Sequence, residues 1–129
     1  MPRLASVYAK MLGEKISKHN TAVYLINTGW SGGPYGVGKR IKIEYSRAMV
    51  TAVINGSLDI VKFSHNDLFN LDVPTECPGV PSEVLEPRNT WVDKDAYDLS
   101  AKKLAQMFVD NFKKFKDASE EIRSAGPKL

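Results

Sequence analysis

A run of twelve residues, Asn27 to Gly38, constrains this chain more than any other part of the sequence. The run reads NTGWSGGPYGVG and contains five glycines together with Pro34. Glycine weakens the interior of helices and strands, and it adopts the positive φ angles that other residues avoid. The run is therefore predicted to be a loop whose backbone turns sharply or approaches another group closely.

Part of this loop imitates a phosphate-binding P-loop. Gly33, Gly38 and Lys39 match the first seven positions of the pattern GxxxxGK[ST]. The eighth position is Arg40, which has no hydroxyl to bind magnesium, and the alternating residues 40–44 predict a strand where a P-loop begins a helix. The match therefore fails in composition and in context. Two interpretations of Lys39 and Arg40 stay open: they contact a nucleotide, or they are solvated residues of a plain turn.

Three helices with a few short strands are predicted from the remaining periodicity. Apolar residues recur at three- and four-residue steps in three segments, which are residues 4–19, 46–54 and 97–115. Ser46 is a candidate N-cap of the second segment, and Asn55-Gly56 is its predicted end. The expected fold class is α/β.

The strands are harder to place. Residues 22–26 (AVYLI) show no polar alternation, which predicts a strand buried on both faces. Residues 57–91 carry several prolines and are predicted to hold one or two short strands. Such a long stretch with little regular structure is unusual in a compact small domain, which indicates that this chain rests on another one.

Composition limits the classes of protein that remain. The 129 residues are 43% hydrophobic, which fits one small domain, and 18 basic against 15 acidic residues give a net charge of +3. The charges are mixed along the chain, which argues against nucleic-acid binding through the lysine-rich last helix. The sequence lacks an apolar run of membrane-spanning length and an apolar signal segment, and Cys77 is the single cysteine. We expect a soluble protein of a reducing compartment, and with only two histidines it resembles a binding unit or a piece of a larger protein more than a self-sufficient enzyme.

Residues 25–40 (LINTGWSGGPYGVGKR) strongly resemble a stretch near the C-terminus of ATP-dependent phosphoenolpyruvate carboxykinases. Further segments resemble the same family in the same order. These are residues 7–14 (VYAKMLGE), 69–80 (FNLDVPTECPGV), 87–90 (PRNT) and 125–129 (AGPKL). The resemblance extends over nearly the whole chain from about Ala5 onward, and the glycine–tryptophan loop followed by Gly-Lys-Arg is its most specific part.

The resemblance implies that residues 1–129 form a single segment, the C-terminal portion of the nucleotide-binding domain of a two-domain α/β enzyme. Family members are decarboxylating lyases of gluconeogenesis that convert oxaloacetate and ATP to phosphoenolpyruvate, carbon dioxide and ADP with Mg and usually Mn. The family's P-loop, metal ligands and oxaloacetate-binding arginines lie upstream of this segment. The expected partners are therefore ATP and the remainder of the carboxykinase chain, the expected location is cytoplasmic, and the isolated chain is expected to be inactive.

Three positions correspond to the adenine and ribose side of the family's ATP site. Arg40 corresponds to the arginine that packs on the base and ribose, and Ile41 to its neighbour lining the adenine pocket. Ser46 corresponds to a position that is commonly threonine and bonds the adenine side. His19 and His65 lie outside the matching motifs and are expected at the surface, and Cys77 is expected to be a packed small residue.

An alternative function is also open. The chain can be a non-catalytic interaction module, derived from the same fold, that self-associates through apolar surface left uncovered. Neither nucleic acid nor a membrane is an expected partner under either hypothesis.

Overall fold

Six helices and four short strands make up residues 3–129, the part of the chain that the computed structural model describes. The helices are α1 (Ala5–His19), α2 (Ile43–Ile54), α3 (Ser82–Leu85), α4 (Pro87–Thr90), α5 (Lys94–Phe112) and α6 (Glu120–Ser124). The strands are β1 (Trp30–Ser31), β2 (Lys39–Arg40), β3 (Phe63–Asn66) and β4 (Leu71–Pro74). Within residues 3–129, no helix combines the length and the apolar content needed to cross a lipid bilayer.

The predicted α/β class is confirmed, but the predicted count of roughly three helices is wrong. The three long helices α1, α2 and α5 correspond to the three predicted segments. The additional helices α3, α4 and α6 have only four or five residues. An apolar period of three to four residues cannot show itself over so short a stretch, so these helices have no signature in the sequence.

The start of α2 differs from the prediction, whereas its end is confirmed. The helix begins at Ile43 with Lys42 in the N-cap position, so Ser46 is not the N-cap. The backbone N–H of Ser46 instead donates to the carbonyl of Lys42 at 3.2 Å, and the strand expected over residues 40–44 extends only to Arg40. At the other end Gly56 has a φ of +73°, the left-handed conformation that ends a helix.

The strands form two separate antiparallel hairpins. Trp30 pairs with Arg40 in the first hairpin, which closes the glycine-rich loop, and His65 pairs with Asp72 in the second. The second hairpin confirms that residues 57–91 contain short strands. The strand predicted over residues 22–26 is wrong, because this segment has no regular secondary structure and joins neither of the two sheets. A strand needs neighbouring strands for its N–H and C=O groups, and residues 22–26 pair with none among the described residues.

The buried core is small for a chain of this length. Ala52, Leu58, Cys77 and Val80 form one cluster beneath α2, and α5 contributes the buried Ala101 and Ala105, within residues 3–129. The accessible surface is 9871 Å², whereas a compact protein of 14.3 kDa exposes about 6,800 Å².

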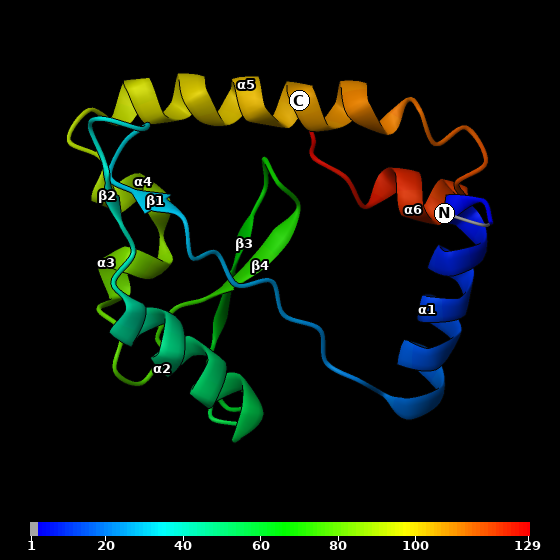
Figure 1. Cartoon of the computed structure of the whole chain (residues 1–129), viewed down its shortest axis with the longest axis horizontal. Coiled ribbons are helices and arrows are strands. Elements are labelled where there is room, and N and C mark those ends of the chain that lie inside the picture. Colours follow the sequence, from blue (N-terminus) through cyan, green and yellow to red (C-terminus); the bar gives the residue numbers. More distant parts are fainter. Residues whose placement is uncertain (1–2) are drawn as a thin grey trace.

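The arrangement of the elements explains this large surface. Figure 1 shows an open frame in which α5 runs along one side, α1 stands apart from α2, and the β3–β4 hairpin lies between them. Large apolar side chains consequently face solvent on several elements, including Leu25 at 82% exposure, Ile54 at 80% and Leu99 at 71%. The frame therefore carries apolar surface that the described residues do not cover.

Candidate functional site

The glycine-rich loop folds into a hairpin whose backbone leaves no room for side chains at its base. A Cβ added to Gly38 would lie 2.4 Å from the carbonyl oxygen of Gly33 and 2.7 Å from that of Ser31. At the turn, the N–H groups of Val37 and Gly38 both donate to the carbonyl of Pro34, at 3.0 and 2.9 Å. At Gly38 the predicted close approach of the backbone is therefore an approach of the loop to itself.

The glycine-rich turn of the hairpin is followed by a strand and not by a helix. β2 follows Gly38 directly and pairs with β1, and α2 begins only at Ile43. Helix α2 consequently does not begin at the glycine-rich turn, whereas the helix of a P-loop does. The structure agrees with the rejection of the P-loop match.

A groove of about 290 Å³ lies between the hairpin, the start of α2 and the α3–α4 region. It is lined by Ser31, Gly32, Val37, Gly38, Lys39, Arg40, Ile41, Lys42, Tyr45, Val84 and Thr90. The lining combines three cations with apolar and aromatic side chains, and it contains no acidic residue. Its volume is just below the range of about 300–1,000 Å³ typical of small-molecule sites.

Two of the three sequence-predicted site residues lie in this groove. Arg40 and Ile41 are both part of its lining, with Arg40 exposed and Ile41 half-buried. Ser46 is not part of the lining, and it lies half-buried within α2, one turn beyond Lys42. The structure thus brings Arg40 and Ile41 together and leaves Ser46 further along the helix.

Sequence reasoning missed several residues of the groove. Lys42 and Tyr45 lie close to Arg40 in the sequence, but the strand expected over residues 40–44 hid the helical turn that brings them there. Val84 and Thr90 reach the groove only through tertiary structure. In the sequence, Thr90 stands out only as part of the motif PRNT, and that motif predicts no role for it.

The charge of the groove is set by its basic side chains. Among residues 3–129, no ion pair involves the guanidinium of Arg40, so it is free to meet an anionic or aromatic ligand. Tyr45 and Glu44 raise the pKa of the Lys42 ammonium. The Lys42 Nζ lies 5.3 Å from the centre of the Tyr45 ring and 3.4 Å from Glu44 Oε1. Lys42 therefore carries its positive charge at neutral pH.

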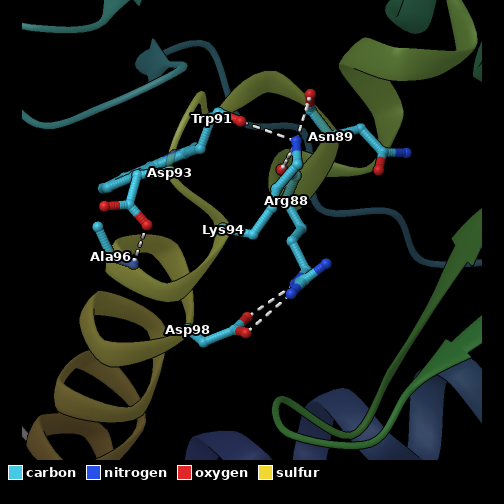
Figure 2. A network of polar contacts seen from close by, with 7 residues as sticks. All are labelled: Arg88, Asn89, Trp91, Asp93, Lys94, Ala96 and Asp98. Carbon is cyan, nitrogen blue, oxygen red and sulfur yellow. Dashed lines mark hydrogen bonds and ion pairs between the residues drawn. The ribbon is translucent and has the colours of Figure 1, made fainter.

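The groove rests on a polar junction between α4 and α5, here defined as residues 87–98 and drawn in Figure 2. Arg88 binds Asp98 through two parallel hydrogen bonds, Nε to Oδ1 at 2.9 Å and Nη2 to Oδ2 at 3.0 Å. Lys94 Nζ donates to three backbone carbonyls at the end of α4, and Asp93 Oδ1 accepts from the N–H of Ala96 at 2.9 Å. The Arg88 guanidinium lowers the pKa of the Asp98 carboxyl.

The histidines and the cysteine lie away from the groove. His19 is exposed, and His65 Nδ1 lies 2.8 Å from Asp72 Oδ1 across the second hairpin. Cys77 is buried, and that burial raises the pKa of its thiol, which suits a packing role. Within residues 3–129, no group of three or more His, Cys, Asp or Glu side chains is placed to hold a metal ion.

Comparison with known proteins assigns the chain to a family. The sequence model of the phosphoenolpyruvate carboxykinase family, ATP type, matches residues 1–83. Since this match covers more than half of the chain, the chain belongs to the ATP-type phosphoenolpyruvate carboxykinase family.

Individual relatives extend the match to the whole chain. A phosphoenolpyruvate carboxykinase (ATP) of Caldanaerobacter subterraneus subsp. tengcongensis is 62% identical over 128 residues, which are 99% of this chain and 25% of the relative. The enzymes of the same name from Fusobacterium nucleatum and Geobacillus kaustophilus are 60% and 52% identical over 129 residues, again over 25% and 24% of their lengths. The chain therefore spans about a quarter of the length of the curated relatives that it matches.

Proposed function

We propose that this chain supplies the adenine and ribose side of the ATP site in an ATP-dependent phosphoenolpyruvate carboxykinase. The reaction is the conversion of oxaloacetate and ATP to phosphoenolpyruvate, carbon dioxide and ADP. Residues 1–129 form one segment, the C-terminal portion of the nucleotide-binding domain. The observation that carries the proposal is that Arg40 and Ile41 line one groove together with Lys39 and Lys42 and with no acidic side chain.

The chemistry of this groove suits the base and ribose of a nucleotide. The planar guanidinium of Arg40 can stack on a purine, an interaction that is worth about 2 kcal/mol or more where water is excluded. Ile41 and Val84 provide apolar surface for the flat faces of the ring, and the lysines attract the polyphosphate. Ser46 contributes its hydroxyl to the base edge if the site extends along α2 beyond the groove.

Catalysis requires groups that the described residues do not provide. No group of three or more His, Cys, Asp or Glu side chains in residues 3–129 is placed to hold a metal ion, so no ligand of the family's Mg or Mn is assigned to this segment. The phosphate-holding and oxaloacetate-holding groups belong to the remainder of the enzyme. The isolated chain is therefore inactive and binds ATP weakly, since most of the ligand's contacts are absent.

The uncovered surface supports the remainder of the carboxykinase as the partner. The chain exposes about 3,000 Å² more than a compact protein of its mass, several times the roughly 800 Å² that each partner contributes to a standard protein–protein interface. An excess of exposed surface of this size is expected of a domain from which a part of the core is missing. The segment 22–26 exposes Val23 and Leu25, apolar side chains that the remainder of the enzyme can cover.

Self-association is the second candidate function, favoured by the same exposed apolar surface. The two candidates separate when the chain is mixed with the N-terminal three quarters of the Caldanaerobacter relative. Recovery of oxaloacetate- and ATP-dependent phosphoenolpyruvate formation supports the first candidate. A stable homo-oligomer in sedimentation that neither binds the relative's fragment nor restores turnover supports the second.

The nucleotide role is tested in a chimera in which residues 1–129 replace the corresponding quarter of the Caldanaerobacter relative. Arg40→Ala is expected to raise the KM for ATP at least tenfold, because it removes the stacking surface, and to leave the KM for oxaloacetate unchanged. Arg47→Ala is the matched control, since Arg47 is an exposed arginine of α2 outside the groove. Unchanged nucleotide dependence in the Arg40 variant, or a folded chimera without activity, would contradict the proposed function.

A further inference from the structure

Thr90, at the end of α4, holds the glycine-rich hairpin from outside. Its Oγ1 accepts a hydrogen bond from the backbone N–H of Gly32 at 3.0 Å and donates one to the carbonyl of Pro87 at 2.7 Å. Gly32 has a φ of +80°, and a Cβ at that position would lie 3.1 Å from the carbonyl oxygen of Thr90. The hairpin backbone and the end of α4 are therefore in direct contact, at a place where only glycine fits well.

The end of α4 is itself fixed by a lysine. Lys94 Nζ donates to the carbonyls of Arg88, Asn89 and Trp91 at 2.9, 3.0 and 2.7 Å (Figure 2). A helix of four residues satisfies few of its own carbonyls, so the three acceptors gathered by Lys94 define where the helix ends. Thr90 lies within this span, and its position is thereby set.

A second contact joins α4 to the rigid start of α5. The two parallel hydrogen bonds between Arg88 and Asp98 constrain orientation as well as distance, which single ion pairs do not. Asp93 caps the first turn of α5 and so fixes the helix on which Asp98 lies. An unbroken series of hydrogen bonds thus leads from α5 through α4 to the hairpin.

The hairpin passes this constraint to the groove. Gly32 directly follows β1, in which Ser31 pairs with Lys39 and Trp30 with Arg40. Displacement of Gly32 consequently displaces the strand pair that holds Arg40. Such a displacement also changes how the Arg40 guanidinium is oriented toward a bound base, and the strength of a stacking contact depends on that geometry.

We propose that Thr90 is a positioning residue of the nucleotide site, which acts through the Gly32 N–H to hold Arg40 in register with the base. The proposal rests on the proposed function of the groove. Thr90 needs no contact with the nucleotide for this role. Its hydroxyl supplies the one side-chain hydrogen bond that ties the hairpin to α4 among the described residues.

The test uses the same chimera with Thr90→Val, which keeps the shape of the side chain and removes the hydroxyl. The KM for ATP is expected to rise about fivefold, the factor that corresponds to one hydrogen bond of about 1 kcal/mol, with the KM for oxaloacetate unchanged. Thr90→Ser retains the hydroxyl and is expected to remain within twofold of the parent. Thr51→Val is the matched control, since Thr51 is an exposed threonine of α2 outside the groove.

A double-mutant cycle separates positioning from general stability. If Thr90 acts through Arg40, Thr90→Val has no further effect on the KM for ATP in the Arg40→Ala background. A full fivefold effect in that background, or an equal rise in the KM for oxaloacetate, overturns the proposal. Should the valine variant not fold, Lys94→Met tests the same series of contacts, and an unchanged KM for ATP in that variant overturns the proposal as well.

The outcomes also distinguish a failure of the proposed function from a failure of the positioning role of Thr90. An Arg40→Ala variant with unchanged KM for ATP removes the proposed function, whatever Thr90 does. A raised KM in Arg40→Ala together with an unchanged KM in Thr90→Val leaves the proposed function intact and removes the positioning role alone.

Discussion

Replacing Gly38 by alanine tests whether the closed base of the hairpin is needed for the nucleotide site. A Cβ at this position lies 2.4 Å from the carbonyl oxygen of Gly33, which is 1.0 Å short of the 3.4 Å at which ordinary contacts begin. The other close atoms, the carbonyl oxygen of Ser31 and the backbone N of Gly33, lie at 2.7 and 2.8 Å. All three belong to the backbone, so no side chain can rotate away, and the two limbs of the hairpin must separate.

The expected magnitude follows from this overlap. Overpacking costs about 1–3 kcal/mol, and a clash against three backbone atoms of the opposite limb belongs at the upper end. A loss of about 3 kcal/mol in the hairpin conformation that holds Arg40 corresponds to a roughly hundredfold loss in affinity. We therefore expect Gly38→Ala to raise the KM for ATP in the chimera about one hundredfold and to leave the KM for oxaloacetate unchanged.

Gly36→Ala provides the matched control within the same loop. Gly36 has a φ of +89°, and a Cβ there would meet no atom within 4 Å. This substitution therefore costs only the left-handed backbone strain of about 1–2 kcal/mol, and Gly36 lies outside the groove. Equal effects of the two substitutions, or a Gly38→Ala variant with the KM of the parent, would refute the argument from the closed hairpin.

Two further predictions concern the long helices. Gly13→Ala in a peptide of residues 3–21 is expected to raise the helix content measured by circular dichroism. Gly13 lies within α1 with no atom within 4 Å of an added Cβ, and alanine favours the helix by about 1 kcal/mol. An unchanged spectrum would count against α1 as a helix formed by local preference. The lowered pKa of Asp98 means that its pair with Arg88 stabilises the fold fully above the ordinary carboxyl pKa of about 4 and loses this effect as the pH falls through the lower folded value. The difference in urea midpoint between the chimera and its Asp98→Asn variant is therefore expected to shrink below pH 4, and a difference that grows on acidification would contradict the assigned cause.

Local patterns in the sequence were reliable wherever the interaction itself is local. The three long helices and the left-handed end at Gly56 depend on residues within one or two turns of each other. The glycine-rich loop was recognisable because glycine density limits the backbone whatever surrounds it. Arg40 and Ile41 are adjacent in the sequence, and this local proximity brings both into one groove.

The wrong predictions concern segments whose structure depends on residues far away in the sequence. The alternation in residues 40–44 has the period of a strand, but β2 ends at Arg40, opposite the first residue of its partner β1, and helix α2 begins at Ile43. The segment 22–26 has the composition of a buried strand, yet no strand pairs with it within residues 3–129. Periodicity reports which face of an element prefers burial, and it cannot report whether a neighbour is present to bury it.

The sequence by itself indicated the family and the fold class, and it predicted three site residues, of which Arg40 and Ile41 line one groove. Only the tertiary structure showed that Thr90 and Val84 join them, that Ser46 lies beyond the groove, and that the junction 87–98 supports the hairpin. The physical reason is the range of the contacts. Backbone conformation depends mainly on residues that are adjacent in the sequence. The contact between Gly32 and Thr90, by contrast, joins segments that are far apart along the chain, and it forms only when the chain is folded.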